Sequence, residues 1–217
     1  RQSILQTDSV FFEGGHDIFG GSYRFTAREG DRSWGFTLSD GMGMSDSNGI
    51  GRNIRRDAAG NVLRDERFEN DSWGGGQAGR VNYAGPLFGG KIDATVRYGV
   101  NDFQNWQELA SATAKCRSAY AEDGHSGELG LTWTRPLNPR WTLETRLIHE
   151  FGDYDNVSVS NATVNAVVDP EQRFTSNGET SESIIRALVR NERSPALTLE
   201  LGGEMAYNML DVTQGYS

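Results

Sequence analysis

The chain has 217 residues, a formal net charge of -9, and only 36% hydrophobic residues. This acidity argues against nucleic-acid binding, which needs an excess of clustered Lys and Arg. The single cysteine, Cys116, excludes an internal disulfide framework and a four-cysteine metal site, and the lack of a long apolar run excludes a transmembrane helix. The mean hydropathy of -0.59 and the 27 glycines favour sheet and loops over a thick apolar core.

Segments with period-two alternation, the pattern of β-strands, recur along the chain in pairs. Each pair is joined by a short turn, at 29–31, 85–90, 135–140 and 191–196. The alternating segments are 22–28, 33–39, 79–83, 91–100, 129–133, 141–151, 185–190 and 197–204. The sequence therefore predicts an all-β, antiparallel fold built from hairpins.

Long polar segments separate the hairpins, at about 41–71, 101–126 and 152–182. Loops of this length are uncommon in compact domains, but short turns on one rim and long loops on the other are typical of transmembrane β-barrels. Within these segments we expect a flexible loop at 39–49, a small hairpin turning at Gly60-Asn61, and a short helix at 108–121. The run 39–49 lacks the ligand spacing of an EF-hand calcium loop.

Aromatic residues on the apolar side of the strands fall in two groups, as in the interfacial girdles of a membrane barrel. Near the short turns lie Trp34, Tyr83, Trp133 and Trp141. Near the opposite strand ends we place Tyr98, Phe151 and Tyr207. This pattern predicts that the apolar side faces lipid and the charged side faces an aqueous lumen, although aromatic residues are also favoured in strands generally. The predicted lumen-facing residues are Arg24, Arg28, Asp93, Arg97, Glu144, Arg146, Glu150, Arg186 and Glu200.

In style, the sequence resembles the barrel region of TonB-dependent outer-membrane receptors of Gram-negative bacteria. The resemblance is carried by GGSYRFTAREGDRSWGFTLSDG, by RRDAAGNVLRDER before Trp73, by GPLFGGKIDATVRYGV, and by LTWTRPLNPRWTLETRLIHEFGDYD. It implies that residues 1–217 are part of a larger barrel of about 22 strands, cut at both ends, whose plug domain and TonB-coupling segment lie outside this chain. It also implies energy-coupled uptake of a scarce ligand such as a ferric siderophore. The partners would be outer-membrane lipid, lipopolysaccharide, the plug and TonB.

Candidate ligand contacts lie in the predicted outer loops, where Arg52, Arg55 and Arg56 could attract an anionic chelate or a lipid phosphate. Three aromatic residues, Phe103, Trp106 and Tyr120, could form a ligand platform. The scattered histidines and the lack of a nucleophile beside a base predict no enzyme activity, no bound metal and no cofactor. Two alternatives stay open: a secreted β-sandwich or adhesin-like binding module, and a small outer-membrane barrel.

Overall fold

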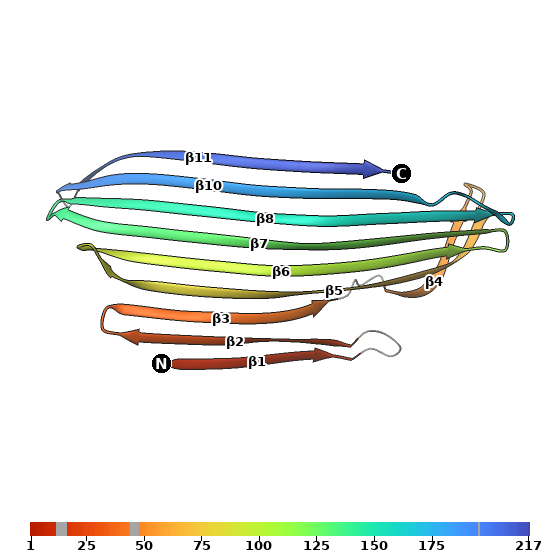
Figure 1. The fold of residues 1–217 in the computed structure, drawn as a ribbon, viewed down its shortest axis with the longest axis horizontal. Helices are drawn as coiled ribbons and strands as arrows, with labels where there is room; N and C mark the ends of the chain where they lie inside the picture. Colours follow the sequence, from red (N-terminus) through yellow and green to blue (C-terminus); the bar gives the residue numbers. More distant parts are fainter. Residues whose placement is uncertain (12–16, 44–47, 195) are drawn as a thin grey trace.

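The computed structural model describes residues 1–11, 17–43, 48–194 and 196–217, which form β-strands and no helix (Figure 1). The strands are β1 (Gln2–Val10), β2 (Ile18–Glu29), β3 (Arg32–Gly43), β4 (Gly49–Arg56), β5 (Val62–Leu87), β6 (Gly90–Ala110), β7 (Ala114–Asn138), β8 (Trp141–Val164), β9 (Val167–Val168), β10 (Gln172–Ser194) and β11 (Leu197–Tyr216). The predicted all-β class is confirmed.

All strands belong to one antiparallel sheet, in the order β1-β2-β3-β5-β6-β7-β8-β10-β11. The edges are β1 and β11, so the described residues make an open sheet (Figure 1). Closure into a barrel stays a prediction. The strand β4 pairs with the first part of β5, and the two form a hairpin that stands out at one end of the sheet (Figure 1).

The four predicted short turns are confirmed, since each lies between two paired strands; residue 195, in the last of them, lies outside the described residues. Between β5 and β6 the turn residues Phe88 and Gly89 both have positive φ, 47° and 73°. A two-residue turn of this kind matches the twist of the flanking strands, and glycine reaches that conformation without strain. The Gly60-Asn61 prediction is also confirmed, because the turn between β4 and β5 closes at Asp57 to Asn61.

The predicted long loops are wrong over most of their length. Segment 101–126 continues β6 to Ala110 and resumes as β7 at Ala114, which also replaces the expected helix at 108–121. Segment 152–182 belongs mainly to β8 and β10, and 41–71 to β3, β4 and β5, with 44–47 outside the described residues. The strand containing Trp73 begins earlier, at Val62. Several strands are therefore far longer than the sequence indicated, with 26 residues in β5 and 24 in β8.

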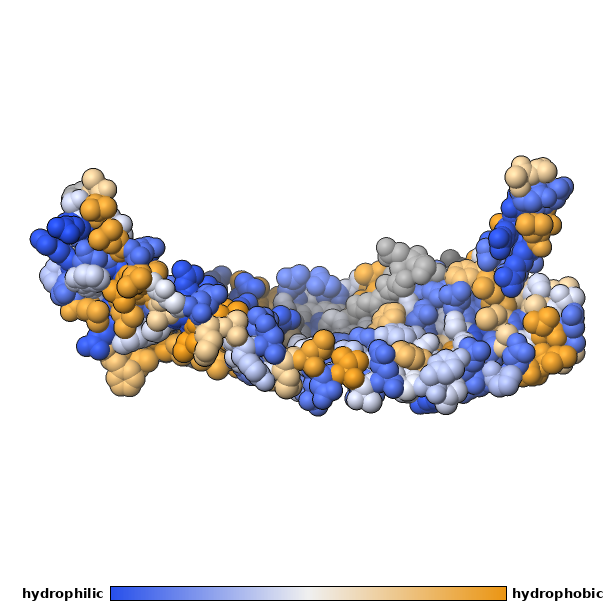
Figure 2. Space-filling model, turned by 90° about the horizontal axis from the view of Figure 1, so that it is seen from above, coloured by the Kyte–Doolittle hydropathy of each residue, from blue (hydrophilic) through white to orange (hydrophobic). Residues whose placement is uncertain are grey.

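The sheet is a single layer. Among the described residues only Ala27 and Ile92 are buried hydrophobic side chains, and Figure 2 shows a thin curved body whose ends turn to the same side. A β-sandwich buries its apolar side chains between two packed sheets. The described residues form one sheet, so they do not make the two packed layers that the sandwich alternative requires.

The pairing registers define two faces, because residues directly opposite each other on neighbouring strands point to the same side. One series of partners runs Arg24, Thr37, Arg80, Arg97, Glu128, Glu150 and Glu182. We call the side carrying this series the polar face and the other side the apolar face. The residues predicted to line the lumen all lie on the polar face. Side chains alternate along a strand, so a residue an even number of positions from a member of this series on the same strand lies on the same face. All of them but Glu200 meet this condition or belong to the series, and Glu200 lies on the polar face because it pairs with Arg190, which does meet it.

Candidate functional site

The apolar face carries a continuous band of hydrophobic side chains, many of which are exposed. It starts next to the short turns, at Trp141, and ends at a row of cross-strand partners that contains Tyr23, Tyr98 and Phe151. We call this region the apolar band. Its other members include Phe25, Trp34, Phe36, Leu38, Val81, Tyr83, Ile92, Val96, Leu129, Leu131, Trp133, Leu143, Leu147, Ile185, Val189, Leu199, Leu201 and Met205.

The height of the apolar band can be worked from β8, on which it runs from Trp141 to Phe151. At about 3.4 Å per residue this is roughly 34 Å along the strand. Strands of membrane barrels tilt by about 35–45°, which reduces the height to roughly 24–28 Å, close to the apolar band of about 25 Å in such barrels. The remaining part of β8, from Gly152 to Val164, extends beyond the band.

Aromatic side chains close the band on both sides. On the side away from the short turns, Phe151 covers Gly127 so closely that a Cβ there would lie 2.3 Å from the phenyl ring. On the turn side, the Trp133 indole N–H donates to the backbone carbonyl of Leu87 at 2.9 Å. Tyr98 and Phe151 were expected near strand ends, but β6 and β8 continue well past them, so both residues lie in the middle of long strands.

One polar pair lies inside the band. His149 Nδ1 is 2.9 Å from the Ser183 hydroxyl on the neighbouring strand. The hydrogen bond gives both groups a partner, and an unpartnered polar group is costly in an apolar environment. The register places His149 on the apolar face.

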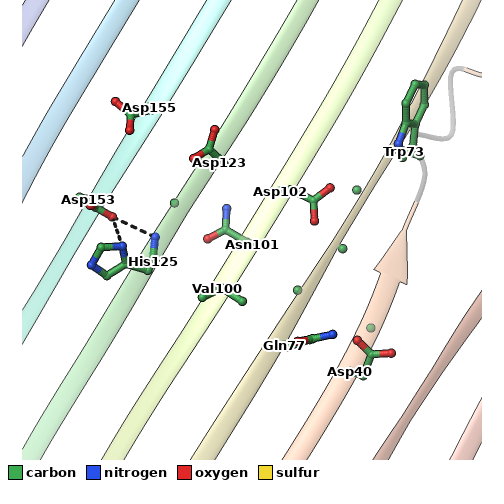
Figure 3. Close-up of a pocket in the computed structure, with 15 residues that line it drawn as sticks. Asp40, Trp73, Gln77, Val100, Asn101, Asp102, Asp123, His125, Asp153 and Asp155 are labelled. Atoms are coloured by element: carbon green, nitrogen blue, oxygen red, sulfur yellow. Dashed lines mark hydrogen bonds and ion pairs between the residues drawn. The ribbon is translucent and has the colours of Figure 1, made fainter.

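Directly beyond the aromatic row the apolar face becomes acidic (Figure 3). Asp102, Asp123 and Asp155 are cross-strand partners, and they line a hollow of about 680 Å³ together with Asp40 and Asp153. The Asp153 carboxylate contacts His125 Nδ1 at 2.5 Å and accepts from its backbone N–H at 3.1 Å. We call this region the acidic border. The acidic border marks the end of the apolar band on the side away from the short turns.

The predicted arginine contacts lie on the hairpin of β4 and β5. Arg52 forms an ion pair with Asp65 across the hairpin, and Arg56 donates to the Gly60 carbonyl at 3.0 Å. Arg55 is exposed. At the turn, Asp57 accepts from Asn61, and these hydrogen bonds lower the pKa of the Asp57 carboxyl. Much of this arginine cluster therefore stabilises the hairpin itself.

The predicted aromatic platform is only partly assembled. The rings of Phe103 and Tyr120 lie 6.2 Å apart on the polar face, while Trp106 points to the apolar face, where Arg117 stacks over it at 5.5 Å. The Tyr120 hydroxyl donates to Glu122. The pKa of Tyr120 is raised to about 12, mainly because the hydroxyl is partly buried and secondly because the Glu122 carboxylate accepts its proton in a hydrogen bond. Trp106 therefore cannot join the other two rings in one surface.

Three further residues of the polar face, Arg80, Glu128 and Glu182, were not among the predicted lumen residues. The alternation pattern could have assigned each of them to the polar face, because each is next in sequence to an apolar-face residue. Only the pairing register shows that they lie in one row with Arg97 and Glu150. Cys116 is an exposed free thiol. Among the described residues there is no cluster of His, Cys, Asp and Glu suited to a metal ion, and no helix is long and apolar enough to span a membrane.

Comparisons with known proteins give little further information. No protein-family model matches the chain, and no curated protein does. Among solved structures, the chain is similar to the Pseudomonas putida toluene transporter TodX, with 8% identity, a TM-score of 0.25, and coverage of 98% of this chain and 86% of that one. A likeness this weak carries no functional information.

Proposed function

We propose that this chain forms part of the wall of an outer-membrane β-barrel transporter, with the apolar band against lipid and the polar face toward a water-filled bore. Its function would be passage or uptake of a solute rather than catalysis. In lipid every backbone N–H and C=O must be paired, which favours strands arranged in a closed barrel. The edges β1 and β11 would then pair within that barrel.

The apolar band is the observation that carries this proposal. A single sheet in water would expose large hydrophobics such as Leu201 and Leu5, which are 79% and 72% exposed, and contiguous apolar surface of this kind marks a membrane or protein interface. Its height of roughly 24–28 Å is close to a bilayer's hydrocarbon core. The acidic border would then lie at the level of the lipid head groups, and the β4–β5 hairpin beyond them.

The more specific form of the proposal is a TonB-dependent receptor that takes up a scarce ligand such as a ferric siderophore. It is supported by the sequence resemblance and by the exposed Arg55 of the β4–β5 hairpin, whose guanidinium group suits an anionic chelate. Partners in this form are lipopolysaccharide, a plug domain and TonB. Reading the gene on the N-terminal side tests it: a plug domain supports the receptor, and a coding frame without one contradicts it.

The face assignment can be tested with two adjacent cysteine probes. Leu147→Cys lies on the apolar face and Ile148→Cys on the polar face at nearly the same depth. Each is placed in a Cys116→Ser background, labelled with an environment-sensitive fluorophore, and reconstituted in vesicles. We expect spin-labelled lipid to quench the probe at 147 and iodide to quench the probe at 148. Equal quenching of both probes by both agents would contradict the barrel wall.

A further inference from the structure

The polar face carries a row of charges that are segregated by sign. Counting across the sheet, the cross-strand partners are Arg24, Thr37, Arg80 and Arg97, followed by Glu128, Glu150 and Glu182. The arginines come from β2, β5 and β6, and the glutamates from β7, β8 and β10. We call this the charged row. It crosses the sheet one residue on the turn side of the aromatic row that ends the apolar band, since Glu150 precedes Phe151 and Arg97 precedes Tyr98.

Charge segregation in this row is unfavourable for the sheet alone. Arg80 lies directly opposite Arg97, and Glu150 directly opposite both Glu128 and Glu182. Like charges that face each other across strands destabilise the pairing. An alternating order would have satisfied the same residues as ion pairs. Sheet stability therefore does not explain the arrangement.

Within the described residues, none of the six charged side chains of the row has a hydrogen-bond or ion-pair partner. Other arginines of the chain do: Arg52 pairs with Asp65, and Arg190 with Glu200. The guanidinium groups of the row thus keep their donors available on the same surface.

The arginine half of the row borders a hollow of about 470 Å³. Its lining includes Arg24, Arg80, Arg97, Thr37 and Asn82. The Asn82 side-chain oxygen already accepts from Thr95 at 2.9 Å, which leaves its amide N–H groups as free donors. The lining is therefore rich in donors, and Glu128 is the acidic group at its margin.

Guanidinium groups bind carboxylates and phosphates through paired hydrogen bonds that combine charge with geometry. We propose that Arg24, Arg80 and Arg97 form an anion-binding site on the polar face for a small solute that carries a carboxylate or phosphate group. The glutamate half repels the same group, so a solute with one anionic end is held at β2 to β6 rather than at β7 to β10. This inference rests on the proposed function, because in a barrel the site would lie in the bore and would determine which class of solute is bound there.

Binding can be measured by calorimetry on the detergent-solubilised protein, with citrate as the carboxylate probe and inorganic phosphate as the other. We expect saturable binding of at least one probe, weakened about tenfold by Arg80→Gln and again by Arg97→Gln, because each loses a charged hydrogen bond. Glu128→Gln should strengthen binding a few-fold by removing the repulsive carboxylate. The preferred probe identifies the source of the anionic group.

The matched control is Arg28→Gln, which removes an arginine from the same face outside the row; Arg28 instead donates to the Gly30 carbonyl at 3.3 Å. It should change the affinity less than twofold. Equal weakening by Arg28→Gln and Arg80→Gln, or no saturable binding of either probe, would overturn the anion site. Those results would leave the face assignment intact, because the quenching of probes at 147 and 148 does not depend on anions.

Discussion

Replacing one leucine at the middle of the apolar band tests the depth of the band directly. Leu147 lies on β8 about six residues from Trp141 and about four from Phe151, which places it near mid-height. Its cross-strand partners on the apolar face are Leu131 and Ile185. In a bilayer, Leu147→Arg would put a charge close to the hydrocarbon midplane.

The expected cost depends on depth. An arginine at the midplane of a membrane barrel costs about 2–4 kcal/mol, and near the interface about 0–1 kcal/mol. Leu147→Arg should therefore lower the free energy of unfolding by about 2–4 kcal/mol. Leu143 lies about two residues from Trp141, which places it roughly 5 Å inside the turn-side edge of the apolar band and closer to the interface than Leu147. Leu143→Arg should therefore cost only about 1 kcal/mol. A gradient between the two positions is the specific signature of a lipid-facing band.

The assay is urea unfolding of the protein refolded into lipid vesicles, followed by tryptophan fluorescence. Ile148→Arg is the matched control, because it also replaces an aliphatic residue by arginine, one position away on the polar face, where only the contact with Ile184 is lost. Glu144→Gln, also on the polar face, should be nearly neutral. Equal destabilisation by Leu147→Arg and Ile148→Arg would refute the assignment of the faces.

Three further predictions follow from local contacts. Gly127→Ala should destabilise the protein by about 1–3 kcal/mol, since the new methyl group meets the Phe151 ring at 2.3 Å, and Phe151→Leu should restore most of that loss in the same unfolding assay; additive losses would contradict the contact. Trp133→Phe should cost about 0.5–1.5 kcal/mol through the lost hydrogen bond to Leu87, and an unchanged unfolding free energy would disprove it. Asn61→Ala should raise the pKa of Asp57 toward its ordinary value of 3.8, as measured by an NMR titration of the carboxyl carbon; an unchanged pKa would contradict the turn geometry.

The Asn61→Ala substitution should also change how the stability of the turn depends on pH. The folded pKa of Asp57 is lowered by hydrogen bonds to its ionised form, so its contribution to turn stability is fully present above the ordinary pKa. It is lost as the pH falls through the folded value. In Asn61→Ala the side-chain hydrogen bond is lost while the backbone bonds to Asp57 remain, so the turn should become less sensitive to pH in this acidic range, which amide-exchange rates at residues 59 and 61 would report.

The sequence by itself determined the class of the fold, the four tight turns and the division of side chains between two faces. Each follows from local chemistry, because alternation has the period of a strand and turn residues permit the required φ. Arg24, Asp93, Glu144 and Arg186 could therefore be assigned to one face without coordinates. The Gly60-Asn61 hairpin was predictable for the same reason.

The tertiary structure decided the length of the strands and the register between them. Beyond the aromatic row both faces carry a mixture of polar and apolar residues, as in 101–110 and 114–126, so alternation disappears although the backbone of these segments continues to pair. Period-two alternation of hydrophobicity arises only where the two faces of a strand lie in different environments, so it cannot identify a strand whose two faces lie in similar ones. Register likewise joins residues far apart in sequence, such as Arg80 with Arg97 and Glu150 with Glu182, and only that pairing brings the separate charges into one row.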